Sequence, residues 1–81
     1  MQIEVRLDCR LAGLAGKPRL RVELADGATV ADLLRCLGET YPGLESGLTA
    51  ALPIVHGNHA TTGQRLSEHA EVALLMPAAG G

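Results

Sequence analysis

Two separate segments of the sequence alternate strictly between apolar and charged residues. In QIEVRLD, Ile3, Val5 and Leu7 take every second position, and charged residues stand between them. RLRVEL repeats the pattern over residues 19–24. Side chains of a β-strand point alternately to its two faces, so this period predicts strands with one buried and one solvated face. The buried face of such a sheet needs a second layer to cover it.

The period changes after residue 26, where we expect that second layer to begin. Asp26-Gly27 is typical of a turn, and Thr29 is a good residue with which to cap a helix. The apolar residues that follow recur at helical spacing and are Val30, Leu33, Leu34 and Leu37. They form one stripe of an amphipathic helix. Pro42 disfavours helical geometry at the residue before it, so we expect the helix to end near residue 40.

The other segments complete an α+β pattern. We expect CRLAGLAGKP (residues 9–18) to be a loop, with Leu11 and Leu14 folded over one end of the core. GLESGLTAA is a loop or a short helical turn, and LPIVHGNH is a short strand that enters a turn at Gly57-Asn58. Residues 60–70 are a polar loop anchored by Leu66, and EVALLM is a last strand that Pro77 ends.

The order strand, strand, helix, strand, strand favours a mixed sheet of four to five strands with one main helix on one face. We expect the first and last strands to lie side by side and parallel in the middle of the sheet, as in the β-grasp fold.

The composition limits the classes of function. The 81 residues suffice for one domain, and a net charge of −2 gives no general attraction to nucleic-acid phosphates. Tyr41 is the one aromatic residue, whereas single-stranded nucleic acids bind through aromatic stacking. VALLMPAA is too short to span a bilayer, and no signal peptide is visible. We therefore expect a cytoplasmic protein that binds neither nucleic acid nor membrane, with Cys9 and Cys36 as reduced thiols.

The sequence stops in MPAAGG, directly after the last predicted strand. Together with DGATVADLLRCLGETYPGL and IVHGN, the ending EVALLMPAAGG resembles the MoaD/ThiS family of ubiquitin-like sulfur carriers. The resemblance extends over nearly the whole chain. The long connection between the first two strands makes it most similar to MoaD, the small subunit of molybdopterin synthase. It implies a β-grasp domain over residues 1–76 and a flexible tail over residues 77–81.

The resemblance implies a carrier protein rather than an enzyme. In this family an E1-like adenylyltransferase of the MoeB or ThiF type uses ATP to activate the C-terminal carboxylate, and sulfur then replaces AMP to give a thiocarboxylate. In this sequence the reacting carboxylate belongs to Gly81, and Gly80 adds no Cβ that would obstruct its approach. The acceptor of the sulfur would be an enzyme such as the large subunit of molybdopterin synthase. The carrier itself needs no permanently bound cofactor.

The outward face of the last strand is the predicted partner-binding surface. If Val72 and Leu74 face the helix, the residues between and after them face the open side of the sheet, beside the tail. Either Ile54 or Val55 faces the same side. An apolar area there suits a docking surface, although a single exposed leucine is also ordinary. Pro77 fixes where the tail leaves the sheet, and two alanines keep it narrow. The predicted partner-binding residues are Ala73, Leu75, Pro77, Ala78 and Ala79.

Other interpretations remain open. The same chemistry can serve the synthesis of thiamine, cysteine or thiolated tRNA, or can attach a ubiquitin-like modifier to lysines. A different class is a non-catalytic β-grasp binding module. His56, His59 and His69 are possible zinc ligands, but turns are ordinary places for histidine and no carboxylate or cysteine is in tight register with them. We therefore predict no metal site. Either cysteine could relay a persulfide, although a small apolar filler is the favoured role.

Overall fold

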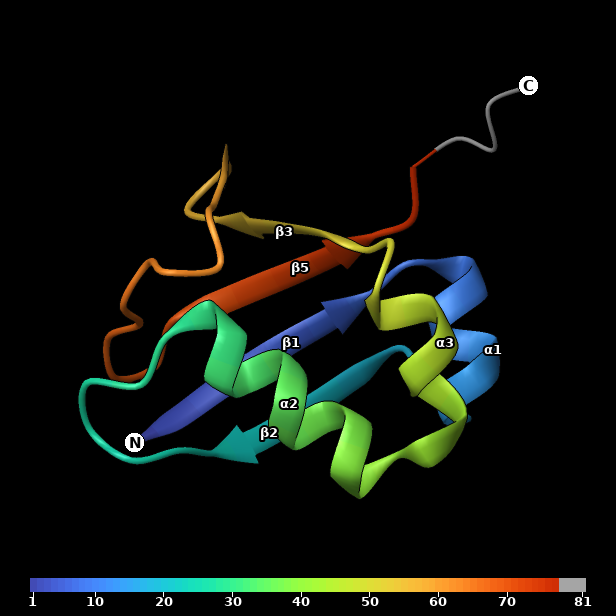
Figure 1. The fold of residues 1–81 in the computed structure, drawn as a ribbon, viewed down its shortest axis with the longest axis horizontal. Helices are drawn as coiled ribbons and strands as arrows, with labels where there is room; N and C mark the ends of the chain where they lie inside the picture. The colour runs from blue at the N-terminus through green and yellow to red at the C-terminus, as the bar shows by residue number, and fades with distance from the viewer. Residues whose placement is uncertain (78–81) are drawn as a thin grey trace.

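A five-stranded mixed sheet forms one layer of the protein, and α2 lies across one face of it (Figure 1). The computed structural model describes residues 1–77. The strands are β1 (Gln2–Leu7), β2 (Arg19–Glu23), β3 (Leu52–Val55), β4 (Asn58–His59) and β5 (Glu71–Leu75), in the order β2-β1-β5-β3-β4. β1 and β5 pair in parallel at the centre, and the other neighbours are antiparallel. The predicted α+β architecture is confirmed.

The buried face of the sheet is the one that the alternation predicts. Alternate side chains of each long strand point toward α2, and those between them point to the open face. The fully buried side chains include Ile3, Val5, Val72 and Leu74 from the sheet and Val30, Leu33 and Leu37 from α2. No polar or charged side chain is buried within residues 1–77. Burial of each large apolar side chain contributes about 1.5–3 kcal/mol, so α2 and the sheet stabilise each other.

The main helix, α2 (Val30–Thr40), begins and ends where the sequence predicts. Thr29 and Asp32 form a capping box, in which the Asp32 carboxylate accepts the Thr29 N–H at 2.9 Å and the Thr29 hydroxyl accepts the Asp32 N–H at 3.3 Å. Leu34 is only partly buried, because it lies at the edge of the apolar stripe. The helix is therefore held by three fully buried residues rather than four.

The predicted loop after β1 is wrong, because residues Cys9–Ala15 form a helix, α1. Asp8 caps its first turn, and Gly16 ends it in the left-handed conformation at φ 86°. Leu11 is fully buried and anchors the helix, as expected, but Leu14 points outward and is 49% exposed. Cys9 therefore begins a helix instead of a loop. Local capping and one buried leucine outweigh the helix-weakening effect of the glycine inside α1.

The remaining connections follow the prediction with one shift of a turn. η1 (Pro42–Leu44) and α3 (Glu45–Leu48) are the expected helical turn, and Leu66 is the buried anchor of the long loop. The turn between β3 and β4 lies at His56-Gly57 instead of one residue later, since Asn58 pairs with Val55. His56 and Gly57 both have positive φ, which a tight hairpin of the right twist requires. None of the helices within residues 1–77 has the length and hydrophobicity to cross a membrane.

Gly47 lets α3 pack closely on α1. A Cβ at this position would lie 2.7 Å from Cδ2 of Leu11, which is fully buried and has little room to move. We expect Gly47→Ala to lower the free energy of unfolding by about 1–3 kcal/mol, the usual effect of overpacking. Gly13→Ala is the matched control, because no atom lies within 4 Å of its added Cβ. It should raise stability by about 0.5–1 kcal/mol. Urea unfolding of the three proteins tests this, and equal effects of the two substitutions would contradict it.

Candidate functional site

The candidate site lies where β5 ends, at the same edge of the sheet as the end of β1 and beside α1 and α3 (Figure 1). Ala73 and Leu75 point to the open face, as predicted, with Leu75 43% exposed. Pro77 is exposed and follows directly. The other predicted site residues, Ala78, Ala79, Gly80 and Gly81, lie outside the described residues. The predicted tail over residues 77–81 therefore stays a prediction.

The exposed Leu75 has a cross-strand neighbour that the sequence analysis did not single out. Leu52 of β3 is paired with Leu75 and is 38% exposed. We call these two residues the outer leucine pair. Beside them, Ile54 is paired with Ala73 on the same face, whereas Val55 is buried. The alternation in LPIV is compatible with an outward Leu52. Only the structure, in which β3 begins at Leu52 and pairs this residue with Leu75, shows that it faces outward.

Charged side chains occupy the rest of the open face. The Arg6 guanidinium lies 3.6 Å from the Glu71 carboxylate, and that of Arg21 lies 3.0 Å from the carboxylate of Glu4. These exposed ion pairs contribute little stability. Together with Ile54 and Ala73, Arg6 and Glu71 line a shallow pocket of about 240 Å³. The open face is therefore apolar at its β3–β5 edge and charged over β1 and β2.

The chain is held at the point where it leaves the sheet. The backbone N–H of Met76 donates to Oδ2 of Asp8 at 2.6 Å, and Oδ1 of the same carboxylate accepts the N–H of Leu11 at 3.0 Å. Partial burial raises the pKa of Asp8, but the hydrogen bonds from Leu11 and Met76 lower it more, so the pKa lies below its ordinary value of 3.8. The carboxylate therefore contributes stability at neutral pH that is lost as the pH falls through this lowered pKa.

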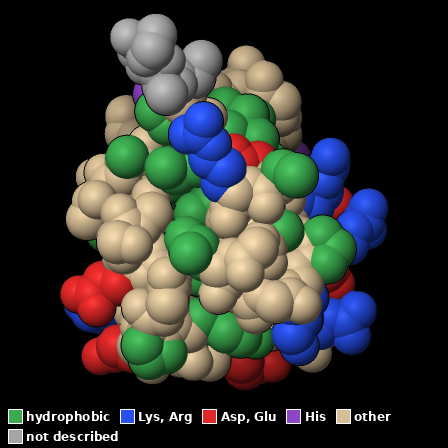
Figure 2. All heavy atoms as spheres, turned by 90° about the vertical axis from the view of Figure 1, so that its right-hand side faces the viewer, with side chains coloured by type: hydrophobic (Ala, Val, Ile, Leu, Met, Phe, Trp, Pro, Cys, Tyr) green, Lys and Arg blue, Asp and Glu red, His purple; other side chains and the backbone are tan. Residues whose placement is uncertain are grey.

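Figure 2 looks at this end of the molecule. Hydrophobic side chains are spread over it among backbone and uncharged polar side chains, and most of the basic and acidic side chains stand at its margins.

Comparisons with known proteins identify the family of the chain. The sequence profile of the ThiS family matches residues 10–81. The chain belongs to the ThiS family. The resemblance to the MoaD/ThiS sulfur carriers is thereby confirmed, and the chain is a member of a group of small ubiquitin-like carrier and modifier proteins that are not themselves catalytic. The comparison with curated proteins finds no match.

Solved structures share the fold over the whole length of the chain. Small archaeal modifier protein 1 from Haloferax volcanii is 30% identical, with a TM-score of 0.90 and 100% of both chains covered. A Pyrococcus furiosus protein described as molybdopterin converting factor, subunit 1, is 20% identical, with a TM-score of 0.87 and 96% and 99% of the two chains covered. A chain in the complex of subunits 1 and 2 of the Helicobacter pylori molybdopterin-converting factor has a TM-score of 0.70 at 20% identity, with 100% of both chains covered. The fold is the ubiquitin-like β-grasp.

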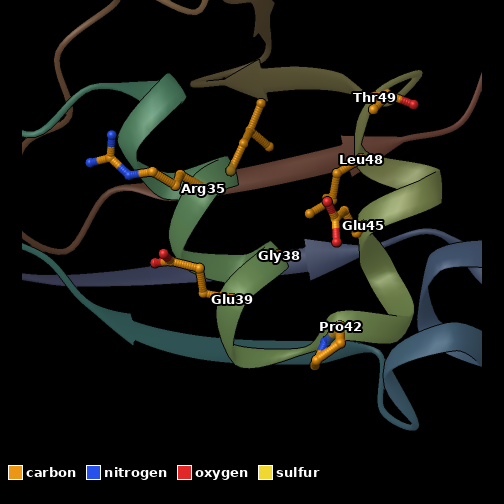
Figure 3. A pocket seen from close by; sticks show the side chains of 8 residues that line it. Arg35, Gly38, Glu39, Pro42, Glu45, Leu48 and Thr49 are labelled. Atoms are coloured by element: carbon orange, nitrogen blue, oxygen red, sulfur yellow. The ribbon is translucent and has the colours of Figure 1, made fainter.

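A pocket on another surface of this ThiS-family protein lies beside its short helices. This pocket, of about 590 Å³, opens between α2 and the segment formed by η1 and α3 (Figure 3). Arg35, Gly38 and Glu39 line it from α2, and Pro42 and Glu45 line it from the short helices. It lies on the helix side of the sheet, away from the outer leucine pair on the open face. None of the predicted site residues lines it.

The histidines and cysteines of this ThiS-family protein do not form a cluster. Within residues 1–77, no three histidine, cysteine, aspartate or glutamate side chains lie together so that they could hold a metal ion. Nε2 of His69 lies 3.7 Å from Oε1 of Glu68. Cys9 is an exposed free thiol on α1, and Cys36 is a partly buried one on α2. The thiol of Cys36 lies 4.0 Å from the hydroxyl of Thr40 and packs partly against the core.

Proposed function

We propose that this protein is a sulfur carrier whose reacting group is the carboxylate of Gly81. The observation that carries the proposal is the outer leucine pair beside the exit of β5, in a chain that the ThiS family profile matches through residue 81. An apolar docking area next to the point where the chain leaves β5 lets a partner hold the folded domain while the partner reacts with the carboxylate. The cytoplasm, which supplies ATP, is the proposed site of action.

The proposed reaction begins with an attack by a carboxylate oxygen of Gly81 on the α-phosphate of ATP. Pyrophosphate leaves, and an acyl adenylate forms. The terminal sulfur of a persulfide then attacks the acyl carbon, and AMP leaves. A thiol cleaves the resulting acyl disulfide, which yields the thiocarboxylate and a new disulfide. ATP is a substrate of the E1-like partner, so the carrier needs no bound cofactor.

The division of labour follows from the side chains on the described surface. On the open face beside the exit of β5 lie the exposed outer leucine pair and Pro77, with the half-buried Ala73 and Ile54, all of them apolar. The Asp8 carboxylate at the same exit already accepts the N–H groups of Leu11 and Met76. We therefore place the adenylating and sulfur-transferring groups on the partner. The carrier contributes a docking face and a reacting end.

Molybdopterin synthesis is the first candidate pathway. The likeness in fold to subunit 1 of molybdopterin converting factor, in P. furiosus and in the complex with subunit 2 from H. pylori, supports a sulfur-accepting partner of the subunit 2 type. The second candidate is a protein modifier that forms isopeptide bonds with lysines. The 30% identity to a small archaeal modifier protein supports it.

Intact-mass spectrometry tests the proposal. The carrier is purified after expression with an E1-like adenylyltransferase and a persulfide donor, and again without them. We expect a fraction of the first sample to gain the mass difference between one sulfur and one oxygen, located in the C-terminal peptide. Isopeptide-linked Gly81 on lysines of other proteins would favour the modifier pathway. An unchanged mass together with no ATP-dependent adenylation would leave the non-catalytic binding module.

A further inference from the structure

The last main-chain donor of the described chain is held by a side chain from the other end of the sequence. β5 ends at Leu75, and the next N–H, that of Met76, donates to Oδ2 of Asp8 at 2.6 Å across 68 positions of sequence. Pro77 has no N–H to donate. The bond to Asp8 is therefore the final backbone N–H contact that ties the chain to the domain before residue 78.

Two further hydrogen bonds orient Asp8 for this contact. Its N–H donates to the carbonyl of Leu74 at 3.1 Å, which extends the parallel pairing of β1 with β5 by one bond. Its Oδ1 accepts the N–H of Leu11 in the first turn of α1 at 3.0 Å. The other carboxylate oxygen, Oδ2, is left to accept the N–H of Met76. A carboxylate serves both N–H groups at once because it has two acceptor oxygens and no proton to donate.

Packing and charge both support this bond. The Met76 side chain is partly buried against the core, and its Sδ lies 3.9 Å from the point where a Cβ on Gly47 would stand. Arg10 is the charged side chain that acts on the Asp8 carboxylate, and its positive charge favours the ionised form. The acceptor is thus an ion at neutral pH, and charge-assisted hydrogen bonds are the stronger kind.

We propose that Asp8 is a positioning residue for the activation of the chain end: its carboxylate fixes the backbone at Met76, where the chain leaves the sheet beside the outer leucine pair. This inference rests on the proposed function. The outer leucine pair determines how tightly the partner holds the domain, whereas Asp8 determines whether the held domain presents its end along a productive path. The two roles affect different kinetic constants.

The experiment measures ATP–pyrophosphate exchange by the adenylating partner at increasing concentrations of carrier. Asp8→Ala removes both acceptor oxygens, and Asp8→Ser keeps a good helix cap for α1 but is too short to reach Met76 as well. We expect both variants to lower kcat by roughly tenfold, as misplacement of a reacting group does, with KM for the carrier unchanged. Hydrogen exchange of the Met76 amide should become faster in both variants.

Thr29→Ala is the matched control. It removes the cap of α2, so it also costs helix stability, but it leaves the bond between Asp8 and Met76 in place. We expect kcat to stay at the wild-type value in this variant. An unchanged kcat in Asp8→Ala, or an equal fall in Asp8→Ala and Thr29→Ala, would overturn the inference.

Failure of the proposed function gives a different result. If the wild-type carrier supports no exchange with E1-like partners, the sulfur-carrier proposal fails, and with it the role of Asp8 in activation. If the wild type supports exchange and the Asp8 variants match it, only the role of Asp8 is wrong. Unchanged exchange of the Met76 amide in Asp8→Ala would overturn the anchoring itself without any partner.

Discussion

Extending the chain by one residue after Gly81, or deleting Gly81, is expected to abolish adenylation by the partner and to leave thermal stability unchanged. The reacting carboxylate would be displaced by one residue from the α-phosphate of ATP, and misplacement of a reacting group costs orders of magnitude in rate. The fully buried side chains of residues 1–77 end with Leu74, so the folded core does not depend on Gly81. ATP–pyrophosphate exchange and a thermal melt are the two measurements.

Gly81→Ala and Gly80→Ala are milder changes at the same end of the chain. Each adds one methyl group and restricts the backbone without changing the chain length, so we expect a smaller loss of exchange than with the extended chain. Normal exchange with the extended chain would refute the sulfur-carrier proposal.

Leu75→Glu is expected to weaken binding of the adenylating partner by about 1–3 kcal/mol, the range of an interface residue that carries binding energy. Leu75 is 43% exposed, and its neighbour Leu52 is 38% exposed, so a partner that covers both would have to bury the new carboxylate in apolar surroundings. Leu52→Glu combined with Leu75→Glu should weaken binding further. Stability should change by less than about 0.5 kcal/mol for Leu75→Glu, as is usual at exposed positions.

The chain provides a matched control for this substitution. Ala31 is an exposed residue of α2, on the opposite side of the sheet from the outer leucine pair. Ala31→Glu also introduces a carboxylate at an exposed apolar residue and should leave the affinity at the wild-type value. Binding isotherms of the three proteins, beside their thermal melts, measure the difference. Equal affinity of Leu75→Glu and the wild type would remove Leu75 from the interface.

Periodicity in the sequence was sufficient to predict the long elements. The alternation in residues 2–8 and 19–24 predicted which side chains of β1 and β2 are buried and which are exposed. The spacing from Val30 to Leu37 predicted the buried side of α2. These patterns work because one face of each element meets one core, so burial repeats with the period of the backbone. The position of the chain end after the last strand and the family resemblance were likewise inferred from short stretches of sequence.

Periodicity did not predict α1, because this helix is stabilised by a few specific contacts and not by a repeating apolar pattern. Seven residues with one fully buried leucine have too little apolar periodicity to predict a helix. The cap by Asp8, the left-handed Gly16 and the close packing allowed by Gly47 hold it in place. All three features come from residues outside Cys9–Ala15, so the composition of the segment itself suggested a loop.

The sequence by itself determined which residues of β1, β2, β5 and α2 face the core, and it placed the candidate reacting end after the last strand. Only the tertiary structure decided which residues stand beside that end. Leu52 meets Leu75 through the register of β3 on β5, and Asp8 meets Met76 because β1 and β5 run in parallel and end at the same edge. Register between distant strands depends on the packing of the whole sheet against α2. A periodic pattern shows the face on which a residue lies, but not its neighbour from 68 positions away.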